Sequence, residues 1–272
     1  MDSQMVLDPY KLRRIIMNIR KFFNFDEKYS KFNREERNLA AIFYHLLLIE
    51  DNLKTFIGKV EGSPGINKEE LGIYYEYAYL RDFWYQNKSN EEKQKFICDF
   101  LNLPNKQILE KMNVEEFNIY FGAGSKKAIE NPGNWSLKKL AKSINNKEDY
   151  YKVCMFKWSF KVKPDIVIQL SRDEVICIEC KFETKGETKY STNDEALGKV
   201  SQTDVQKYMM DELIGFKAHY VLIVNGKRTK SNTHQVMLWS EAIKGLKLNP
   251  NNDSKMDKHN EFFQGWFDRL VK

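Results

Sequence analysis

The chain has 272 residues, 42% of them hydrophobic and 30% charged, which is enough for one large domain or two small ones. Its 44 basic and 38 acidic residues give a net charge of +6, which allows a polyanionic partner without requiring one. The longest apolar run, residues 39–49, is too short to span a bilayer, and the first residues lack the apolar core of a signal peptide, so we expect a cytoplasmic protein without membrane contact.

Residues 1–148 are predicted to form a mostly helical N-terminal region. Helical periodicity marks residues 10–23, and Asn33 is a good N-cap for a helix that runs to about residue 56. Further helices are expected over residues 68–86, from residue 90 onward, and over 105–112, 114–121 and 137–144. Target recognition, dimerisation or regulation are the roles open to this region.

The predicted helix over residues 68–86 contains a dense set of aromatic side chains. These are Tyr74, Tyr75, Tyr77, Tyr79, Phe83, Trp84 and Tyr85. Aromatic rings stack on bases in proteins that bind single strands. At helical spacing, however, such residues more often belong to the core or to an interface, and we favour that interpretation.

The second half of the chain is predicted to contain a mixed β-sheet. Residues 151–160 are expected to form a strand that leads into two further strands within residues 163–182, joined by a turn at 171–173. A polar loop over 183–199 precedes a helix that starts at Ser201 and stops at Gly215. The remaining elements are a buried strand over 219–224, parallel to the strand before the helix, a strand over 234–239, and helices over 241–246 and 262–270.

Charged residues interrupt the apolar strands within residues 163–182. Side chains alternate along a strand, so Glu179 and Lys181 share a face, and a three-residue turn places Asp165 opposite Glu179 on that face. The Cβ atoms of the two acids are then about 4.5–5.5 Å apart. Two carboxylates this close repel each other unless a cation lies between them, and such oxygen ligands suit Mg²⁺.

This pattern resembles the PD-(D/E)XK nuclease superfamily, which includes many restriction endonucleases. Pro164 and Asp165 match the PD pair, and the run from Glu179 to Lys181 matches the E-x-K triplet. The resemblance covers about residues 152–243. It implies an α/β fold with a restriction-endonuclease-like core, a mixed β-sheet flanked by helices, over residues 149–272, and the helix near residues 34–56 is a candidate member of that core.

The resemblance also implies a metal site and a catalytic amine. Asp165, Glu179 and the backbone carbonyl of Cys180 are the expected ligands of Mg²⁺, for which Mn²⁺ can substitute. Lys181 is expected to orient the attacking water or to stabilise charge on the phosphate.

Two helices are expected to add side chains to this site. The family often has a Gln on the helix after the E-x-K strand, which corresponds to Gln206, with Gln202 one turn earlier. It also often takes an additional acid from a helix ahead of the first core strand. Glu36 is the candidate for that acid, as a further metal ligand, and Glu35 is the alternative.

The implied activity is that of a metal-dependent endonuclease that hydrolyses phosphodiester bonds, with DNA as the preferred substrate, in restriction or phage defence. Homodimerisation would allow two cuts. Two alternatives stay open, namely a non-catalytic nucleic-acid-binding module on the same fold and a helical protein that binds a partner. The intact Asp165, Glu179 and Lys181 argue against the first, since a degenerate site usually loses one of the three.

Overall fold

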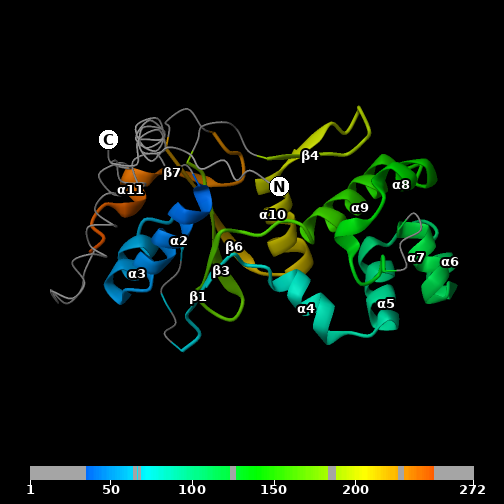
Figure 1. Ribbon diagram of the computed structural model, residues 1–272, viewed down its shortest axis with the longest axis horizontal. Coiled ribbons are helices and arrows are strands. Elements are labelled where there is room, and N and C mark those ends of the chain that lie inside the picture. Colours follow the sequence, from blue (N-terminus) through cyan, green and yellow to red (C-terminus); the bar gives the residue numbers. More distant parts are fainter. Residues whose placement is uncertain are drawn as a thin grey trace, which may run out of the picture. The chain divides into compact units, whose positions relative to one another are not determined.

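The computed structural model describes residues 35–63, 66, 69–122, 127–182, 188–225 and 230–247. Residues Glu36–Lys247 form one compact unit. This unit is mixed α/β, with a five-stranded mixed sheet and helices on both of its faces, which confirms the predicted fold class at this level (Figure 1). The helices predicted over residues 10–23 and 262–270 lie outside the described residues.

The five strands are arranged in the order β1-β2-β3-β6-β7. β1 pairs antiparallel with β2 and β2 with β3, whereas β3, β6 and β7 run parallel to one another. The central strands are buried on both faces, which explains their continuous runs of Val and Ile. Their bounds are Gly72–Tyr75 for β1, Ile166–Gln169 for β2, Glu174–Cys180 for β3, Lys217–Val224 for β6 and Gln235–Leu238 for β7.

The β2–β3 hairpin has the predicted register. Ile166 lies opposite Ile178, and the backbone N–H of Leu170 donates to the carbonyl of Glu174 at 2.8 Å, which closes the turn at 171–173. One step beyond the ladder, Asp165 therefore lies opposite Glu179. The parallel pairing of β3 with β6, joined through a helix, is also as predicted.

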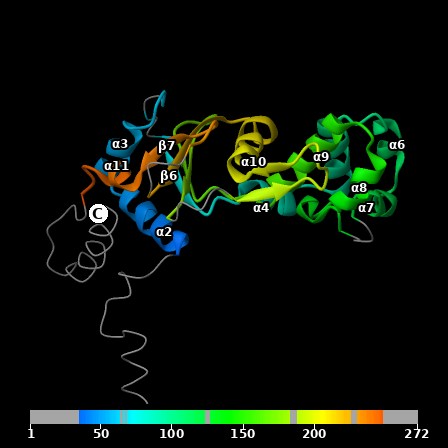
Figure 2. The ribbon, with the colours of Figure 1, turned by 90° about the horizontal axis from the view of Figure 1, so that it is seen from above.

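One face of the sheet is covered by α2 (Glu36–Leu47), α3 (Glu50–Ile57) and α11 (Trp239–Ile243), which lie together in both ribbon views (Figures 1 and 2). Phe43 contacts Phe56 and Trp239 edge-on, with ring centroids 5.2 and 5.6 Å apart. The single helix predicted to residue 56 is in fact two helices. Ile49 is extended (φ −79°, ψ 118°), so the chain changes direction and both helices bury apolar side chains.

The other face of the sheet packs against α10 (Gln202–Tyr208) and its π-helical continuation η3 (Met209–Ile214), beside a group of helices from the middle of the chain. As predicted, Ser201 caps α10 by accepting the N–H of Asp204 at 3.1 Å, and Gly215 ends η3 with a left-handed φ of 84°. The other helices are α4 (Tyr79–Asn87), α5 (Asn90–Leu101), α6 (Lys106–Lys111), α7 (Val114–Gly122), the short η2 (Pro132–Asn134), α8 (Leu137–Ser143) and α9 (Lys147–Ser159).

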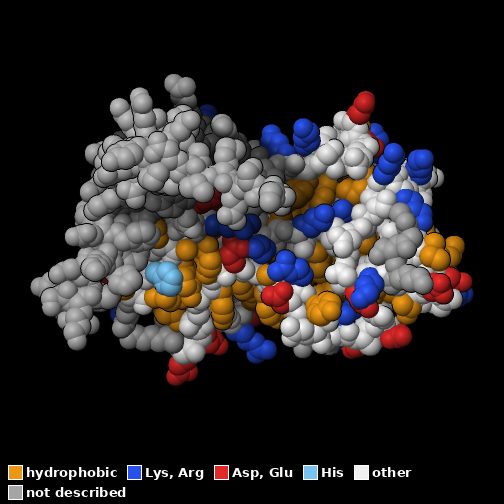
Figure 3. All heavy atoms as spheres, in the orientation of Figure 1, with side chains coloured by type: hydrophobic (Ala, Val, Ile, Leu, Met, Phe, Trp, Pro, Cys, Tyr) orange, Lys and Arg blue, Asp and Glu red, His pale blue; other side chains and the backbone are white. Residues whose placement is uncertain are grey.

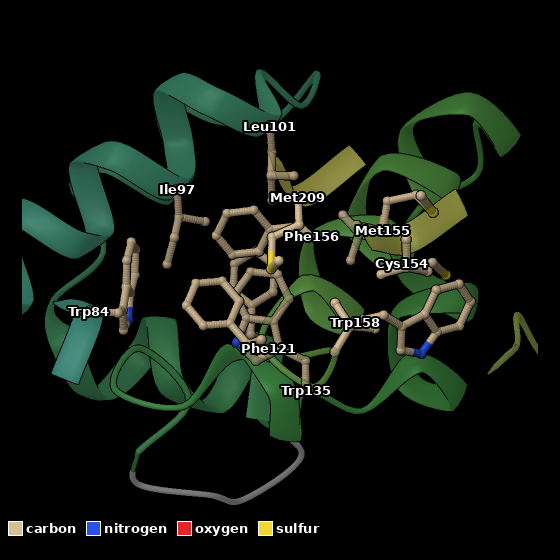
Figure 4. Close-up of a cluster of buried hydrophobic side chains, with 14 of the residues drawn as sticks. Trp84, Ile97, Leu101, Phe121, Trp135, Cys154, Met155, Phe156, Trp158 and Met209 are labelled. Carbon is tan, nitrogen blue, oxygen red and sulfur yellow. The ribbon is translucent and has the colours of Figure 1, made fainter. Parts of the chain in front are cut away.

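A large aromatic core joins these helices to the sheet (Figure 4). Phe156 stacks on Trp135 with ring centroids 5.2 Å apart and meets Trp84 edge-on at 6.2 Å. Val167 and Cys177 extend the same cluster onto the sheet. The core therefore includes residues on both sides of position 148, and a separate role for residues 1–148 stays a prediction.

The strand predicted over residues 151–160 is wrong, because this segment forms α9. The side chain of Asn146 caps the helix by accepting the N–H groups of Glu148 and Asp149 at 2.8 and 3.1 Å. Val153, Met155 and Phe156 are all buried, so α9 is covered on several sides. It therefore has no single apolar stripe, and its alternating apolar residues imitate a strand.

The helix predicted over residues 68–86 is also wrong in its first part, where β1 forms the edge of the sheet. The chain turns at Glu76, which has a left-handed φ of 52°, and then enters α4. The N–H groups of Glu76 and Tyr77 donate to the carbonyls of Asp165 (2.7 Å) and Pro164 (3.0 Å), which continues the contact with β2. Tyr and Ile favour strands when a partner strand is present. The partner β2 lies more than 90 residues away in sequence, so the local sequence pattern does not reveal it.

Part of the predicted polar loop over 183–199 is a second, two-stranded sheet. β4 (Lys189–Ser191) pairs antiparallel with β5 (Lys199–Ser201), whereas residues 183–187 lie outside the described residues. Within the described ranges, no helix is both long enough and apolar enough to cross a membrane.

Candidate active site

The residues singled out by the sequence pattern lie together where β2 begins and β3 ends. Asp165 directly precedes β2, and Lys181 directly follows β3. The Nζ atom of Lys181 lies 2.7 Å from Oε1 of Glu179. The structure thus brings the two acids and the amine to one end of the hairpin.

Glu179 is a buried carboxylate with three side-chain donors. Its side chain is 2% exposed, and Oε1 accepts from Gln202 Nε2 at 2.8 Å in addition to Lys181. Oε2 accepts from Gln206 Nε2 at 2.6 Å. Burial raises the pKa of Glu179, while Lys181 and Gln206 act in the opposite direction. Both predicted glutamines therefore contact the central acid, and the first two turns of α10 position them.

The carboxylate of Asp165 is held by the backbone of the opposite strand. Its Oδ2 accepts the N–H of Cys180 at 2.7 Å. Burial and the nearby Glu179 raise the pKa of Asp165 to about 8, although the Cys180 N–H and Lys181 oppose this shift. Near neutral pH this carboxyl group therefore retains a proton, which a cation at the site would displace.

Lys181 lies between two carboxylates. Besides Glu179, its Nζ atom pairs with Oε2 of Glu36 at 3.4 Å, and the other oxygen of Glu36 accepts the N–H of Phe182 at 3.3 Å. Burial alone would lower the pKa of Lys181, but Glu179 and Glu36 raise it above its ordinary value. The amine is thus a fixed positive charge at neutral pH. The structure places Glu36 at the site, and Glu35 is one residue ahead of α2.

The backbone at the end of β3 also faces the site. The N–H of Lys181 donates to the carbonyl of Ile223 on β6 at 2.7 Å, so the N–H of Cys180 points to the opposite edge of the strand, toward Asp165. In an extended strand the N–H and C=O of one residue point to the same edge. The Cys180 carbonyl therefore faces the Asp165 side as well. Trp239 Nε1 donates to the Lys181 carbonyl at 2.9 Å and fixes the chain just beyond.

Glu76 is a third acid in this row that was not among the predicted site residues. By the register of β1 and β2, Glu76 lies opposite Asp165, as Asp165 lies opposite Glu179. Its carboxylate pairs with Lys163 and, at 3.9 Å, with Arg37. Glu76 could have been placed beside Asp165 by the same strand register, had β1 been predicted as a strand.

The residues at the site fit a hard divalent cation such as Mg²⁺ or Mn²⁺. Asp165, Glu179 and the Cys180 carbonyl offer oxygen atoms, and Oε1 of the fully buried Gln206 has no hydrogen-bond partner among the described residues. Within the described ranges, no three His, Cys, Asp or Glu side chains are arranged to hold a metal by themselves. A site of two carboxylates and a carbonyl, completed by water and a phosphate, is typical of Mg²⁺, which retains several waters in proteins.

Searches of protein-family models, curated proteins and solved structures found no match to this chain.

Proposed function

We propose that this protein is a metal-dependent nuclease of the PD-(D/E)XK kind that hydrolyses phosphodiester bonds in DNA. The observation that carries the proposal is the convergence of Asp165, Glu179 and Lys181 at one end of the β2–β3 hairpin, in the predicted register.

The surplus of carboxyl groups at the site favours a catalytic role over a structural ion pair. Glu179 and Glu36 pair with the amine of Lys181, Asp165 lies opposite Glu179, and the pKa of both Asp165 and Glu179 is raised. Buried charges that serve only stability are usually balanced by their partners, because an unbalanced buried charge is costly. Perturbed carboxylates of this kind are more typical of sites that bind or convert a ligand.

Each residue of the site has a proposed role in metal binding or in stabilising the phosphate. Asp165, Glu179 and the Cys180 carbonyl would hold the cation, which when bound polarises a phosphoryl oxygen and makes a water more acidic. Gln202 and Gln206 fix the carboxylate of Glu179. The amine of Lys181 stabilises negative charge that develops on the phosphate.

The biological setting belongs to the same proposal. Restriction or phage defence in the cytoplasm agrees with the family resemblance, and a homodimer would cut both strands of a duplex. The net charge of +6 is compatible with a polyanionic substrate.

Incubation with supercoiled plasmid, single-stranded DNA and RNA under Mg²⁺, Mn²⁺ or EDTA tests this function. We expect DNA to be cut with either metal and to stay intact in EDTA. Binding without cleavage under both metals would instead identify a non-catalytic nucleic-acid-binding module. Neither binding nor cleavage of any of the three substrates would contradict the proposal.

A further inference from the structure

Four aromatic side chains form a continuous series from the edge of the sheet to α4. The ring centroids of Tyr74 and Tyr77 are 5.7 Å apart, those of Tyr77 and Tyr79 are 5.8 Å apart, and those of Tyr79 and Phe83 are 5.6 Å apart. The last two pairs are nearly parallel, with interplanar angles of 16° and 25°. We call Tyr74, Tyr77, Tyr79 and Phe83 the aromatic ladder.

Most of the aromatic ladder is exposed. Tyr74, Tyr79 and Phe83 are 44%, 46% and 40% exposed, whereas Trp84, the next residue of α4, is 6% exposed and belongs to the core. The run was predicted to belong to the core or to an interface. Trp84 belongs to the core, these three residues do not, and an interface role for them is untested. Neighbouring exposed rings leave a large apolar area in water, which is typical of a binding surface.

The ladder lines a groove of about 740 Å³. Gln86, Gln169 and Arg172 line it as well. The Glu70 carboxylate accepts the backbone N–H of Arg172 at 3.0 Å, and no ion pair to the Arg172 guanidinium is present among the described residues. The acids of the groove are matched by cations, since Asp82 pairs with Arg81 at 3.5 Å and Glu76 pairs with Lys163. Figure 3 shows hydrophobic side chains exposed over β1 and again near α4, with charged side chains between them.

The groove begins next to the candidate active site. Glu76, which lines it, and Tyr77 of the ladder bind the backbone of Asp165 and Pro164 through their N–H groups. Arg172 lies in the turn at the other end of the β2–β3 hairpin. At about 3.3 Å per residue, the seven steps from Asp165 to Arg172 span on the order of 20 Å along β2, the neighbour of the edge strand β1.

We propose that this groove binds an unpaired nucleic-acid strand and leads it to Asp165, with bases on the aromatic ladder and a phosphate on Arg172. This inference rests on the proposed function and specifies its substrate as a single strand or an unpaired end. Parallel ring faces suit bases of any sequence. A planar guanidinium suits phosphate, and among the described residues that of Arg172 forms no ion pair, the Glu70 carboxylate being bound to its backbone N–H. The amides of Gln86 and Gln169 suit the polar edges of bases.

The test measures the dissociation constant of a fluorescein-labelled oligothymidine in EDTA by fluorescence anisotropy, beside a duplex of the same length. We expect the double variant Tyr79→Ala/Phe83→Ala to bind the oligothymidine about 10- to 100-fold more weakly and the duplex nearly as the wild type does. Tyr79→Trp should retain binding, since it keeps a ring at that position. Arg172→Ala should reduce the slope of log affinity against log salt concentration by about 0.7.

Tyr85→Ala is the matched control, since Tyr85 is a 64% exposed aromatic residue of α4 that lies outside the ladder and does not line the groove. It should bind the oligothymidine as the wild type does. Circular dichroism melts of every variant check that the fold is retained.

Four outcomes would overturn the inference in distinguishable ways. If the folded double variant binds and cuts like the wild type, the ladder inference fails and the proposed nuclease function stands. If the double variant changes the oligomeric state in light scattering but not the affinity for oligothymidine, the groove is an interface between two copies. If Tyr85→Ala weakens binding as much as the double variant, the effect does not belong to the ladder. If the wild type neither binds nor cuts nucleic acid, the proposed function fails and the inference fails with it.

Discussion

A carboxylate as deeply buried as that of Glu179 must be neutralised by a proton, a cation or several donors. Here Lys181, Gln202 and Gln206 all point at its two oxygens. Only Gln206 is fully buried among these donors, so its contribution to folding can be measured with little interference from solvent.

Replacing Gln206 with Met keeps much of the side-chain volume and removes the donor to Glu179. A hydrogen bond to a charged group contributes about 1.5–3 kcal/mol, so we expect Gln206→Met to lower the free energy of unfolding by about that amount in a urea titration. Gln202→Met, at the less buried position on the same helix, should lower the free energy of unfolding by less. Equal losses at the two positions would contradict a larger contribution from the buried hydrogen bond between Gln206 and Glu179.

The raised pKa of Asp165 makes stability without metal depend on pH. Its folded-state pKa of about 8 exceeds the ordinary 3.8, so the folded protein binds more protons than the unfolded chain between these values. The contribution of this carboxyl group to stability is therefore complete below pH 4 and is lost as pH rises to 8. Asp165→Asn, which cannot ionise, should raise the thermal midpoint in EDTA at pH 8 and have little effect near pH 4.

The control for this measurement is Asp173→Asn, in the exposed turn at the far end of the same hairpin. Its midpoint should follow that of the wild type at every pH. If Asp165→Asn were less stable than the wild type at pH 8 in EDTA, the ionised carboxylate would not destabilise the fold, which would contradict the raised pKa of Asp165.

At the scale of secondary structure, the sequence predicts best where local rules agree. The β2–β3 register follows from alternation and a three-residue turn, and the start of α10 at Ser201 and the end of η3 at Gly215 follow from capping rules. The convergence of Asp165, Glu179 and Lys181 at one end of the hairpin follows from the β2–β3 register and was therefore predictable, whereas their roles stay predictions.

The elements that were missed depend on tertiary contacts. β1 is a strand because β2 lies beside it, and α9 has no apolar stripe because it is covered on several sides. Glu76 was missed for the same reason, since its place beside Asp165 exists only once β1 joins the sheet. Propensity alone does not contain this information.

The N-cap of α9 allows a test of whether this segment, predicted as a strand, forms a helix. Asn146→Ala removes the acceptor for two backbone N–H groups and should lower the free energy of unfolding by about 1 kcal/mol. Asn145→Ala, one residue earlier and exposed, is the control and should change it by less than about 0.5 kcal/mol. Equal losses in chemical denaturation would argue against the helix cap.

At the scale of the whole unit, the site is assembled from distant parts of the chain. Glu36 comes from α2, Asp165 and Glu179 from the sheet, and Gln206 from α10. An ion that binds these groups only in the folded state must therefore stabilise the whole unit.

Adding Mn²⁺ at about ten times its dissociation constant should raise the free energy of unfolding by about 1.4 kcal/mol, or the thermal midpoint by about 3–5 °C. EDTA should reverse the shift, and Asp165→Asn should largely abolish it. A wild-type midpoint that does not respond to Mn²⁺ or Mg²⁺ at millimolar concentration would contradict a cation site at these residues.

The most direct measurement of the central claim is the rate of Mg²⁺-dependent phosphodiester cleavage by Asp165→Asn, taken together with its thermal midpoint. The structure predicts a folded variant, at least as stable as the wild type in EDTA at pH 8, whose cleavage rate is at least about 100-fold lower, while Asp173→Asn cuts at the wild-type rate. Cleavage by Asp165→Asn at the wild-type rate would contradict the account.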